Sequence, residues 1–161
     1  MKISGIFIVM GMLFIMPSCE EQQTFYNPYT QLQEDIQILD DYLEENNIVA
    51  MKASSGLRYV ILDEGLGSNP VQGSRVTVHY TGTLLDGTVF DSSYDRGEPL
   101  TYTHGIRQVI PGWDEGLSYI GERGKITLYV PSVLAYGSRG SGSIIGPNEN
   151  LIFDVELLSV Q

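Results

Sequence analysis

The sequence has few of the residues on which metal and redox sites depend. It contains one cysteine, Cys19, and two histidines in 161 residues. A single cysteine excludes an internal disulfide, a multi-cysteine zinc site and an iron–sulfur cluster. His79 and His104 stand 25 positions apart, and we interpret each of them as surface or strand polarity. We therefore expect no metal site and no cofactor.

Positive charge is scarce as well. Nine lysines and arginines face twenty aspartates and glutamates, which gives a formal net charge of −11. Proteins that bind nucleic acids need basic surfaces to neutralise phosphates. We therefore expect no nucleic-acid partner.

Common catalytic motifs are also missing. The chain has no glycine-rich phosphate loop, no His-Glu-x-x-His pattern and no Gly-x-Ser-x-Gly nucleophile turn, which disfavours phosphoryl transfer and hydrolysis. Asp114 and Glu115 are adjacent carboxylates. They fall in the first turn of a predicted helix, where negative charge stabilises the helix dipole, so we interpret them as structural.

One apolar run, Ile3 to Met16, stands at the start of the chain. It is shorter than the roughly 20 residues of a lasting membrane span. Lys2 before it and Pro17-Ser18-Cys19 after it predict a signal peptide over residues 1–18. The position of Cys19 resembles the lipobox of bacterial lipoproteins, in which this cysteine is acylated. We expect a lipid-anchored protein of the bacterial cell envelope, on the periplasmic side or the cell surface; an ordinary secretory signal is the alternative.

Residues 19–53 form an acidic leader with eight acids and one lysine. Gln22 to Tyr29 predicts a flexible tether, and Thr30 is expected to cap a helix over residues 31–45. Apolar residues recur at helical spacing on one face of this helix, and the acids are expected on the opposite face. The apolar positions are Leu32, Ile36, Leu39, Tyr42 and Leu43. This face either binds a second copy or another partner, or packs on its own domain.

The rest of the chain, residues 54–161, has the pattern of an antiparallel sheet. Four stretches alternate between apolar and polar residues: Leu57–Leu62, Arg75–Thr81, Lys125–Val130 and Leu151–Leu158. A short helix is expected to begin at Pro111 and end by Gly121. Asp86-Gly87 predicts a tight turn, and residues 138–143 an irregular exposed loop. We expect an α+β fold, a curved antiparallel sheet wrapped around one short helix, preceded by the acidic helix.

Five sequence blocks occur in a specific order. They are Val78 to Gly82, Asp86 to Ser93, Val109 to Trp113, Ala135 to Gly137 and Leu151 to Leu157. In order and spacing they resemble the FKBP-type peptidyl-prolyl cis-trans isomerases, over nearly all of residues 54–161. The acidic leader is similar to that of lipid-anchored FKBP lipoproteins of Bacteroidota.

The resemblance implies a pocket that holds a proline ring on a Trp113 floor. It implies four catalytic residues: Tyr80, Asp91, Ile110 and Tyr136. It implies that the substrate-binding residues are Phe90, Arg96, Leu100, Val109, Trp113, Ile144, Ile145 and Phe153. The Ile110 N–H and the Tyr136 hydroxyl would bond substrate carbonyls, and Asp91 would orient Tyr80 or polarise the site.

The implied reaction suits a site without a nucleophile. Rotation about an X-Pro bond breaks no covalent bond and meets a barrier of about 18–20 kcal/mol. A dry apolar pocket favours the twisted amide, because water stabilises the planar, charge-separated form. The expected partners are proline-containing unfolded or exported polypeptides, with rapamycin-type macrolides as inhibitors.

Four positions depart from the family pattern. Leu100 replaces a common aromatic, Gln108 a common glutamate, Ser141 a histidine of some members, and Gly146 a frequent proline. Together with the preceding glycines, Gly146 predicts a looser loop over the pocket, with altered sequence preference or lower turnover.

Two other functions remain open. The same pocket suits a non-catalytic binding or chaperone module of an envelope complex. A lipoprotein that carries a small ligand is disfavoured, since a lipid needs a longer cavity than one tryptophan floor provides.

Overall fold

The computed structural model describes residues 27–161. The predicted signal peptide and Cys19 lie outside these residues. Within them, no helix is both long and apolar enough to cross a membrane.

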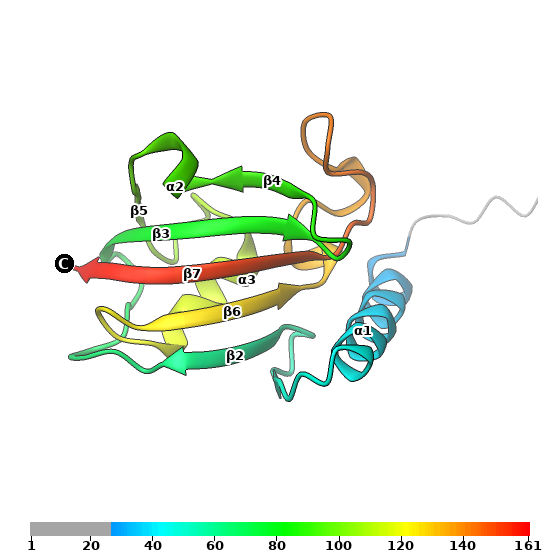
Figure 1. The fold of residues 1–161 in the computed structure, drawn as a ribbon, viewed down its shortest axis with the longest axis horizontal. Helices are drawn as coiled ribbons and strands as arrows, with labels where there is room; N and C mark the ends of the chain where they lie inside the picture. Colours follow the sequence, from blue (N-terminus) through cyan, green and yellow to red (C-terminus); the bar gives the residue numbers. More distant parts are fainter. Residues whose placement is uncertain (1–26) are drawn as a thin grey trace, which may run out of the picture.

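A curved antiparallel sheet dominates this part of the chain (Figure 1). Its strands are β1 (Met51–Lys52), β2 (Arg58–Asp63), β3 (Arg75–Leu84), β4 (Val89–Ser92), β5 (Leu100–Thr103), β6 (Lys125–Val130) and β7 (Leu151–Val160). The strand order is β1-β2-β6-β7-β3-β4, and β5 pairs with the first half of β3. The four predicted strands are confirmed, and β1, β4 and β5 are additional. Strands of two to four residues carry too little alternation to be recognised.

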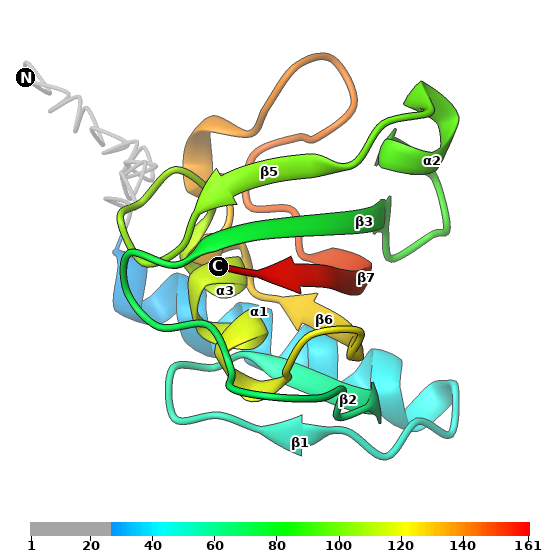
Figure 2. The same ribbon diagram turned by 90° about the vertical axis from the view of Figure 1, so that its left-hand side faces the viewer.

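The sheet curves around a short helix, α3 (Pro111–Gly116), which continues as a 3₁₀ turn over Leu117–Tyr119 (Figure 2). Alternate residues of β3, β6 and β7 form the core between the sheet and this helix. Gly116 permits the close approach, because a Cβ there would lie 2.4 Å from the Leu128 side chain. The predicted α+β fold with one short helix inside the sheet is therefore confirmed.

Helix α1 (Pro28–Glu45) begins three residues earlier than predicted. Asn27, not Thr30, is its N-cap, and the Asn27 side chain accepts a hydrogen bond from the Tyr29 N–H at 2.9 Å. Pro28 follows the cap, at the position where a missing N–H costs nothing. Pro28 and Tyr29 thus belong to the helix and not to a tether.

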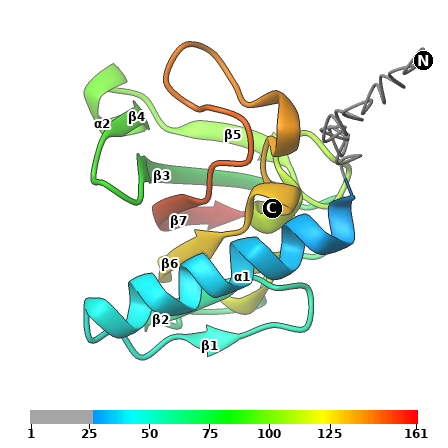
Figure 3. The ribbon, with the colours of Figure 1, turned by 90° about the vertical axis from the view of Figure 1, so that its right-hand side faces the viewer.

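The apolar face of α1 packs across one end of the sheet, where β2 and β6 lie behind it (Figure 3). Leu39 and Leu43 are buried against Tyr129 of β6, with Val60 and Ile152 beside them. This agrees with packing on its own domain. Tyr129, on the face of β6 that points away from α3, is consequently buried as well.

The periodicity predicted that the acids of α1 lie on its solvent side. This does not hold for all of them. Asp35 is fully buried. Asp40 accepts hydrogen bonds from the Arg58 Nε at 2.8 Å and from the Lys52 Nζ at 2.9 Å. Packing brought partners to these two carboxylates that helical spacing alone cannot indicate.

The glycine-serine loop is exposed, as predicted, but it is not irregular. Gly137–Arg139 forms a 3₁₀ turn. Ser141 and Ile145 then exchange two backbone hydrogen bonds, of 2.9 and 3.2 Å. Gly140 has a φ of +62°, and a Cβ there would lie 2.3 Å from the Ile145 oxygen, so glycine is required for this turn.

Candidate active site

A pocket of about 150 Å³ lies between α3, the strands β3, β4, β5 and β7, and the segment after β6. Its lining residues are Tyr80, Phe90, Asp91, Leu100, Gln108, Val109, Ile110, Trp113, Tyr136 and Phe153. The structure thus brings together all four residues expected to be catalytic and five of the eight expected to bind substrate. They come from seven separate segments of the chain, because the strong curvature of the sheet turns the inward faces of its strands toward α3.

Aromatic rings build the floor and one wall. The Trp113 side chain is 3% exposed. The Tyr80 ring stands edge-on to it at 4.8 Å between centroids, and the Phe153 ring edge-on at 5.3 Å. Phe90 meets Phe153 in the same way at 5.5 Å. Edge-to-face packing suits the ring quadrupoles and fixes the rings, so the pocket has rigid apolar walls.

Gly82 in β3 explains how Phe90 reaches the pocket. A Cβ at this position would lie 2.6 Å from the Phe90 ring and 3.0 Å from the Phe153 ring. The missing side chain therefore leaves the space that both rings occupy.

A charged pair forms the polar edge. The Asp91 carboxylate accepts hydrogen bonds from the Tyr80 hydroxyl and the Arg96 guanidinium. Arg96 also donates to the Tyr80 oxygen at 3.1 Å and lies 5.5 Å from the centre of the Tyr80 ring. Burial, and next the Asp91 carboxylate, raise the pKa of Tyr80. The Tyr80 hydroxyl therefore keeps its proton, and its direction is fixed by Asp91.

The opposite rim consists of Ile110 and Tyr136. Ile110 is the N-cap of α3; its carbonyl accepts from the N–H groups of Trp113 and Asp114, at 3.0 and 3.4 Å. Among the backbone hydrogen bonds of residues 27–161, the Ile110 N–H donates none. Tyr136 is 37% exposed, and burial together with the Asp91 charge raises its pKa. Both residues also border an open groove of about 720 Å³ beside the pocket.

Three expected substrate-binding residues do not line the central pocket. Ile144 and Ile145 line a neighbouring cavity of about 320 Å³, which shares Phe90, Asp91 and Tyr136 with it. Ile144 is exposed, whereas Ile145 turns into the core. Arg96 reaches the site only through Asp91 and Tyr80. The ordered turn after Tyr136 places Ile144 and Ile145 in the neighbouring cavity and not at the Trp113 floor.

Ser93 does not line the pocket but holds the backbone of Tyr80, a role that the sequence pattern did not reveal. It is fully buried, its Oγ accepts from the Tyr80 N–H at 2.8 Å, and the same oxygen lies 3.2 Å from the Tyr80 carbonyl. Its signal was the preceding Ser92, which caps the short helix α2 (Ser93–Arg96) with its side chain. Gln108, known only as a departure from the family, lines the pocket and accepts from the Thr103 N–H at 2.7 Å.

His104 is buried and not at the surface, which corrects the expectation. Its Nδ1 lies 3.7 Å from Asp114, and burial lowers its pKa although the Asp114 charge opposes this. Asp114 also accepts from the Gly105 N–H at 2.9 Å, so this carboxylate fixes the loop before α3. Across residues 27–161, no three potential metal ligands cluster together.

The fold and the site combine a curved antiparallel sheet around one short helix with a small aromatic pocket on a tryptophan floor. Residues 67–158 match the family model of the FKBP-type peptidyl-prolyl cis-trans isomerases. The chain therefore belongs to this family of enzymes.

Individual relatives agree with this assignment. An FK506-binding protein of Neisseria meningitidis serogroup A is 56% identical over 99 residues, which cover 62% of this chain and 91% of the relative. The outer membrane protein MIP of Legionella longbeachae is 50% identical over 107 residues, 66% of this chain and 45% of the relative. The crystal structure of FkpA from Escherichia coli matches with a TM-score of 0.71 and 41% identity, over 83% of this chain and 62% of that one.

Proposed function

We propose that this protein accelerates the cis-trans isomerisation of X-Pro bonds in exported polypeptides, with the aromatic pocket as its catalytic site. The observation that carries the proposal is the floor of the pocket, where Tyr80 and Phe153 hold Trp113 edge-on. A proline ring is compact and apolar, and a pocket of about 150 Å³ is of a size to enclose it.

Exclusion of water is the first source of catalysis. The planar amide has charge separation that water stabilises, and the twisted amide has less of it. Phe90, Val109 and the rings around Trp113 surround the bond with apolar atoms. The planar ground state thereby loses more stabilisation than the transition state, which lowers the barrier.

Directed hydrogen bonds are the second source. The Ile110 N–H lies on the rim without a backbone acceptor, so it can bind a substrate carbonyl. The Tyr136 hydroxyl on the same rim can bind another. Hydrogen bonds that are better formed when the amide is twisted lower the barrier further, each by about 1 kcal/mol. Asp91 contributes by holding the Tyr80 hydroxyl and by placing a carboxylate at the polar edge.

The location of this activity is the bacterial cell envelope. Two observations support it: the signal-peptide pattern that ends at Cys19, and a relative named as an outer membrane protein. Acylation of Cys19 would hold the protein at a membrane surface without any spanning helix. Cys19→Ser should abolish the lipid mass on the mature protein and release it from the membrane fraction. An unchanged mass would contradict the anchor.

The isomerase proposal is tested with a short X-Pro peptide and the purified protein. We expect acceleration of the cis-to-trans step that rapamycin blocks and that Asp91→Ala and Tyr136→Phe lower. An uncatalysed rate with folded protein would overturn it. Macrolide binding with an uncatalysed rate would then favour a non-catalytic binding module, in which the same pocket holds a client.

A further inference from the structure

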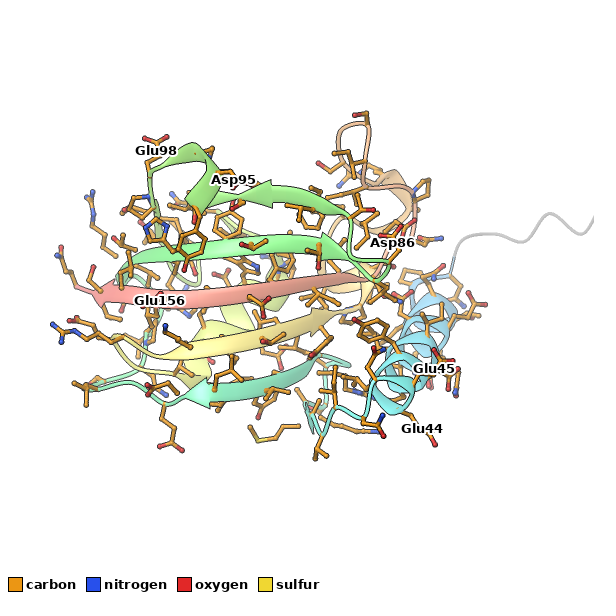
Figure 4. The ribbon with its side chains drawn as sticks, viewed as in Figure 1. Glu44, Glu45, Asp86, Asp95, Glu98 and Glu156 are labelled. Carbon is orange, nitrogen blue, oxygen red and sulfur yellow. The ribbon has the colours of Figure 1, made fainter. Side chains whose placement is uncertain are left out.

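The carboxylate of Asp35 on α1 is buried, and it is not part of the pocket described above. Asp35 is fully buried although α1 lies on the outside of the domain. Its Oδ2 accepts from the Ser132 Oγ at 2.7 Å and from the Val133 N–H at 3.4 Å, and its Oδ1 from the Gln31 side chain at 2.9 Å. By contrast, Glu44 and Glu45 at the end of the same helix are exposed (Figure 4). A buried carboxylate is costly unless it is hydrogen-bonded, so this arrangement is specific.

The partners of Asp35 lie at the two ends of one loop, where it leaves and rejoins the sheet. We call this place the neck of the loop. Residues 131–150 leave the sheet after Val130 and return at Leu151, and these two residues pair across β6 and β7. Just beyond this pair, the Ser132 N–H donates to the Asn150 Oδ1 at 3.0 Å. The Asn150 Nδ2 in turn lies 3.4 Å from the Asp35 carbonyl oxygen. Asp35 therefore joins the outgoing and the returning ends of this loop.

The same loop carries the rim of the pocket. Ser132–Leu134 is a 3₁₀ turn, closed by the Ala135 N–H on the Ser132 carbonyl at 2.9 Å, and Tyr136 follows directly. The turn also lies beside the start of α3, since a Cβ built on Gly112 would lie 3.4 Å from the Leu134 oxygen. The neighbour of Gly112 is Trp113. A shift of Ser132 would thus change the distance between rim and floor.

We propose that Asp35 is a positioning residue of the active site. From the N-terminal helix it holds the neck of the 131–150 loop, and this sets Tyr136 against Trp113 at the spacing that a proline ring requires. The inference rests on the proposed isomerase function. It adds a part to the catalytic unit, because α1 lies outside the residues that match the family.

Asp40 provides a matched control on the same helix. It is five residues further along, and its partners are Arg58 of β2 and Lys52 of β1. Neither partner lines the pocket. Asp40→Ala and Asp35→Ala therefore both weaken the attachment of α1, but only Asp35→Ala releases the loop neck.

The experiment uses the full-length protein and three readouts: kcat/KM on an X-Pro peptide, amide hydrogen exchange of residues 132–146, and macrolide binding followed by the fluorescence of Trp113, the single tryptophan. Asp35→Ala should lower kcat/KM about tenfold, because small displacements of positioning groups have large effects on rate. It should also speed exchange in the loop and weaken macrolide binding. Asp35→Asn keeps an acceptor for Ser132 and should recover most of the rate.

Asp40→Ala should lower the melting temperature while its kcat/KM stays within about twofold of the wild type. Equal losses of rate in Asp35→Ala and Asp40→Ala at equal melting temperature, or a wild-type rate and wild-type loop exchange in Asp35→Ala, would overturn the proposal. Should Asp35→Ala not fold, Ser132→Ala takes its place with the same expectations. A wild-type protein without isomerase activity would remove the proposed function, while loop exchange and macrolide binding would still decide whether Asp35 sets the pocket.

Discussion

The two helices that pack on the sheet are held by different chemistry. α3 lies in the apolar core, with Gly116 in close contact with Leu128 and Trp113 buried among aromatic rings. α1 adds only a small apolar cluster around Leu39 and Leu43, and relies on polar links through Asp35 and Asp40. Close apolar packing makes α3 inseparable from the fold.

Polar links of the second kind contribute less stability but are directional. They can fix the position of a loop without forming the core. The comparison therefore predicts that changes around α3 mainly cost stability, and that changes around α1 separate stability from pocket geometry.

Trp113→Ala should have the largest effect. It removes a 3%-exposed indole from the core that α3 shares with the sheet, and such truncations cost about 3–5 kcal/mol of unfolding free energy. Denaturant unfolding measures the loss, and the isomerase rate should fall to background. A loss under about 1 kcal/mol would mean that α3 is not held by the core.

Arg58→Met should have a smaller effect, which tests the polar attachment of α1. The Arg58 side chain is 7% exposed and bonds both Asp40 and the Gly56 carbonyl. Hydrogen bonds of charged groups contribute about 2 kcal/mol, and we expect a loss of this size at neutral pH. Lys52→Met is the control, since Lys52 is 60% exposed and its pair with Asp40 is screened by water.

The difference between wild type and Arg58→Met should depend on pH. The hydrogen bond from Arg58 lowers the pKa of Asp40 below its ordinary value of 3.8. A lowered folded pKa gives stability that is complete above pH 3.8 and is lost as the pH falls through the folded pKa. The difference between the two proteins should therefore narrow in acid, down to the part that the bond from Arg58 to the Gly56 carbonyl contributes. A constant difference down to the lowest pH at which both remain folded would contradict this role of Asp40.

The features that could be predicted from the sequence lie mainly in the core, and those that could not lie mainly at its periphery. The sequence located β6 to the residue, because its alternation is strong. It missed β4 and β5, which have four residues each. The site residues came from family resemblance and met in one pocket, except Ile144, Ile145 and Arg96, whose placement depends on how the loops turn.

Asp35 shows the limit most clearly. Acids at helical spacing favour a solvated face, and the interpretation failed where the partner, Ser132, lies 97 positions away. The prediction of the N-cap was wrong for a local reason. Thr30 and Asn27 both have side chains that can cap a helix, and only the path of the chain into the helix selects between them. Contacts at long range in the sequence are set by the assembled fold, and periodicity does not encode them.

Asp91→Asn should change activity more than stability. Asp91 is 40% exposed, so its ion pair with Arg96 contributes little to folding. The substitution removes the carboxylate that accepts from the Tyr80 hydroxyl, and we expect kcat/KM to fall about tenfold, as one directed interaction is worth about 1–2 kcal/mol. Peptide isomerisation and thermal unfolding are measured together, with Asp95→Asn on α2 as the control. A fall in stability equal to the fall in transition-state binding would assign Asp91 to the fold.

Gly146→Ala should have the smallest effect. It tests whether the 131–150 loop is already ordered in the wild type. A Cβ at this position would lie 3.4 Å from the Glu149 side chain, an ordinary contact, and its φ is not positive. Alanine should therefore stabilise the protein by about 0.5 kcal/mol, through a smaller entropy of the unfolded chain. Because the Ser141–Ile145 turn already orders this loop, turnover should stay unchanged. If the rate changes while kcat/KM of Asp35→Ala does not, the geometry of the pocket is set by the segment around the Ser141–Ile145 turn and not by the neck of the loop.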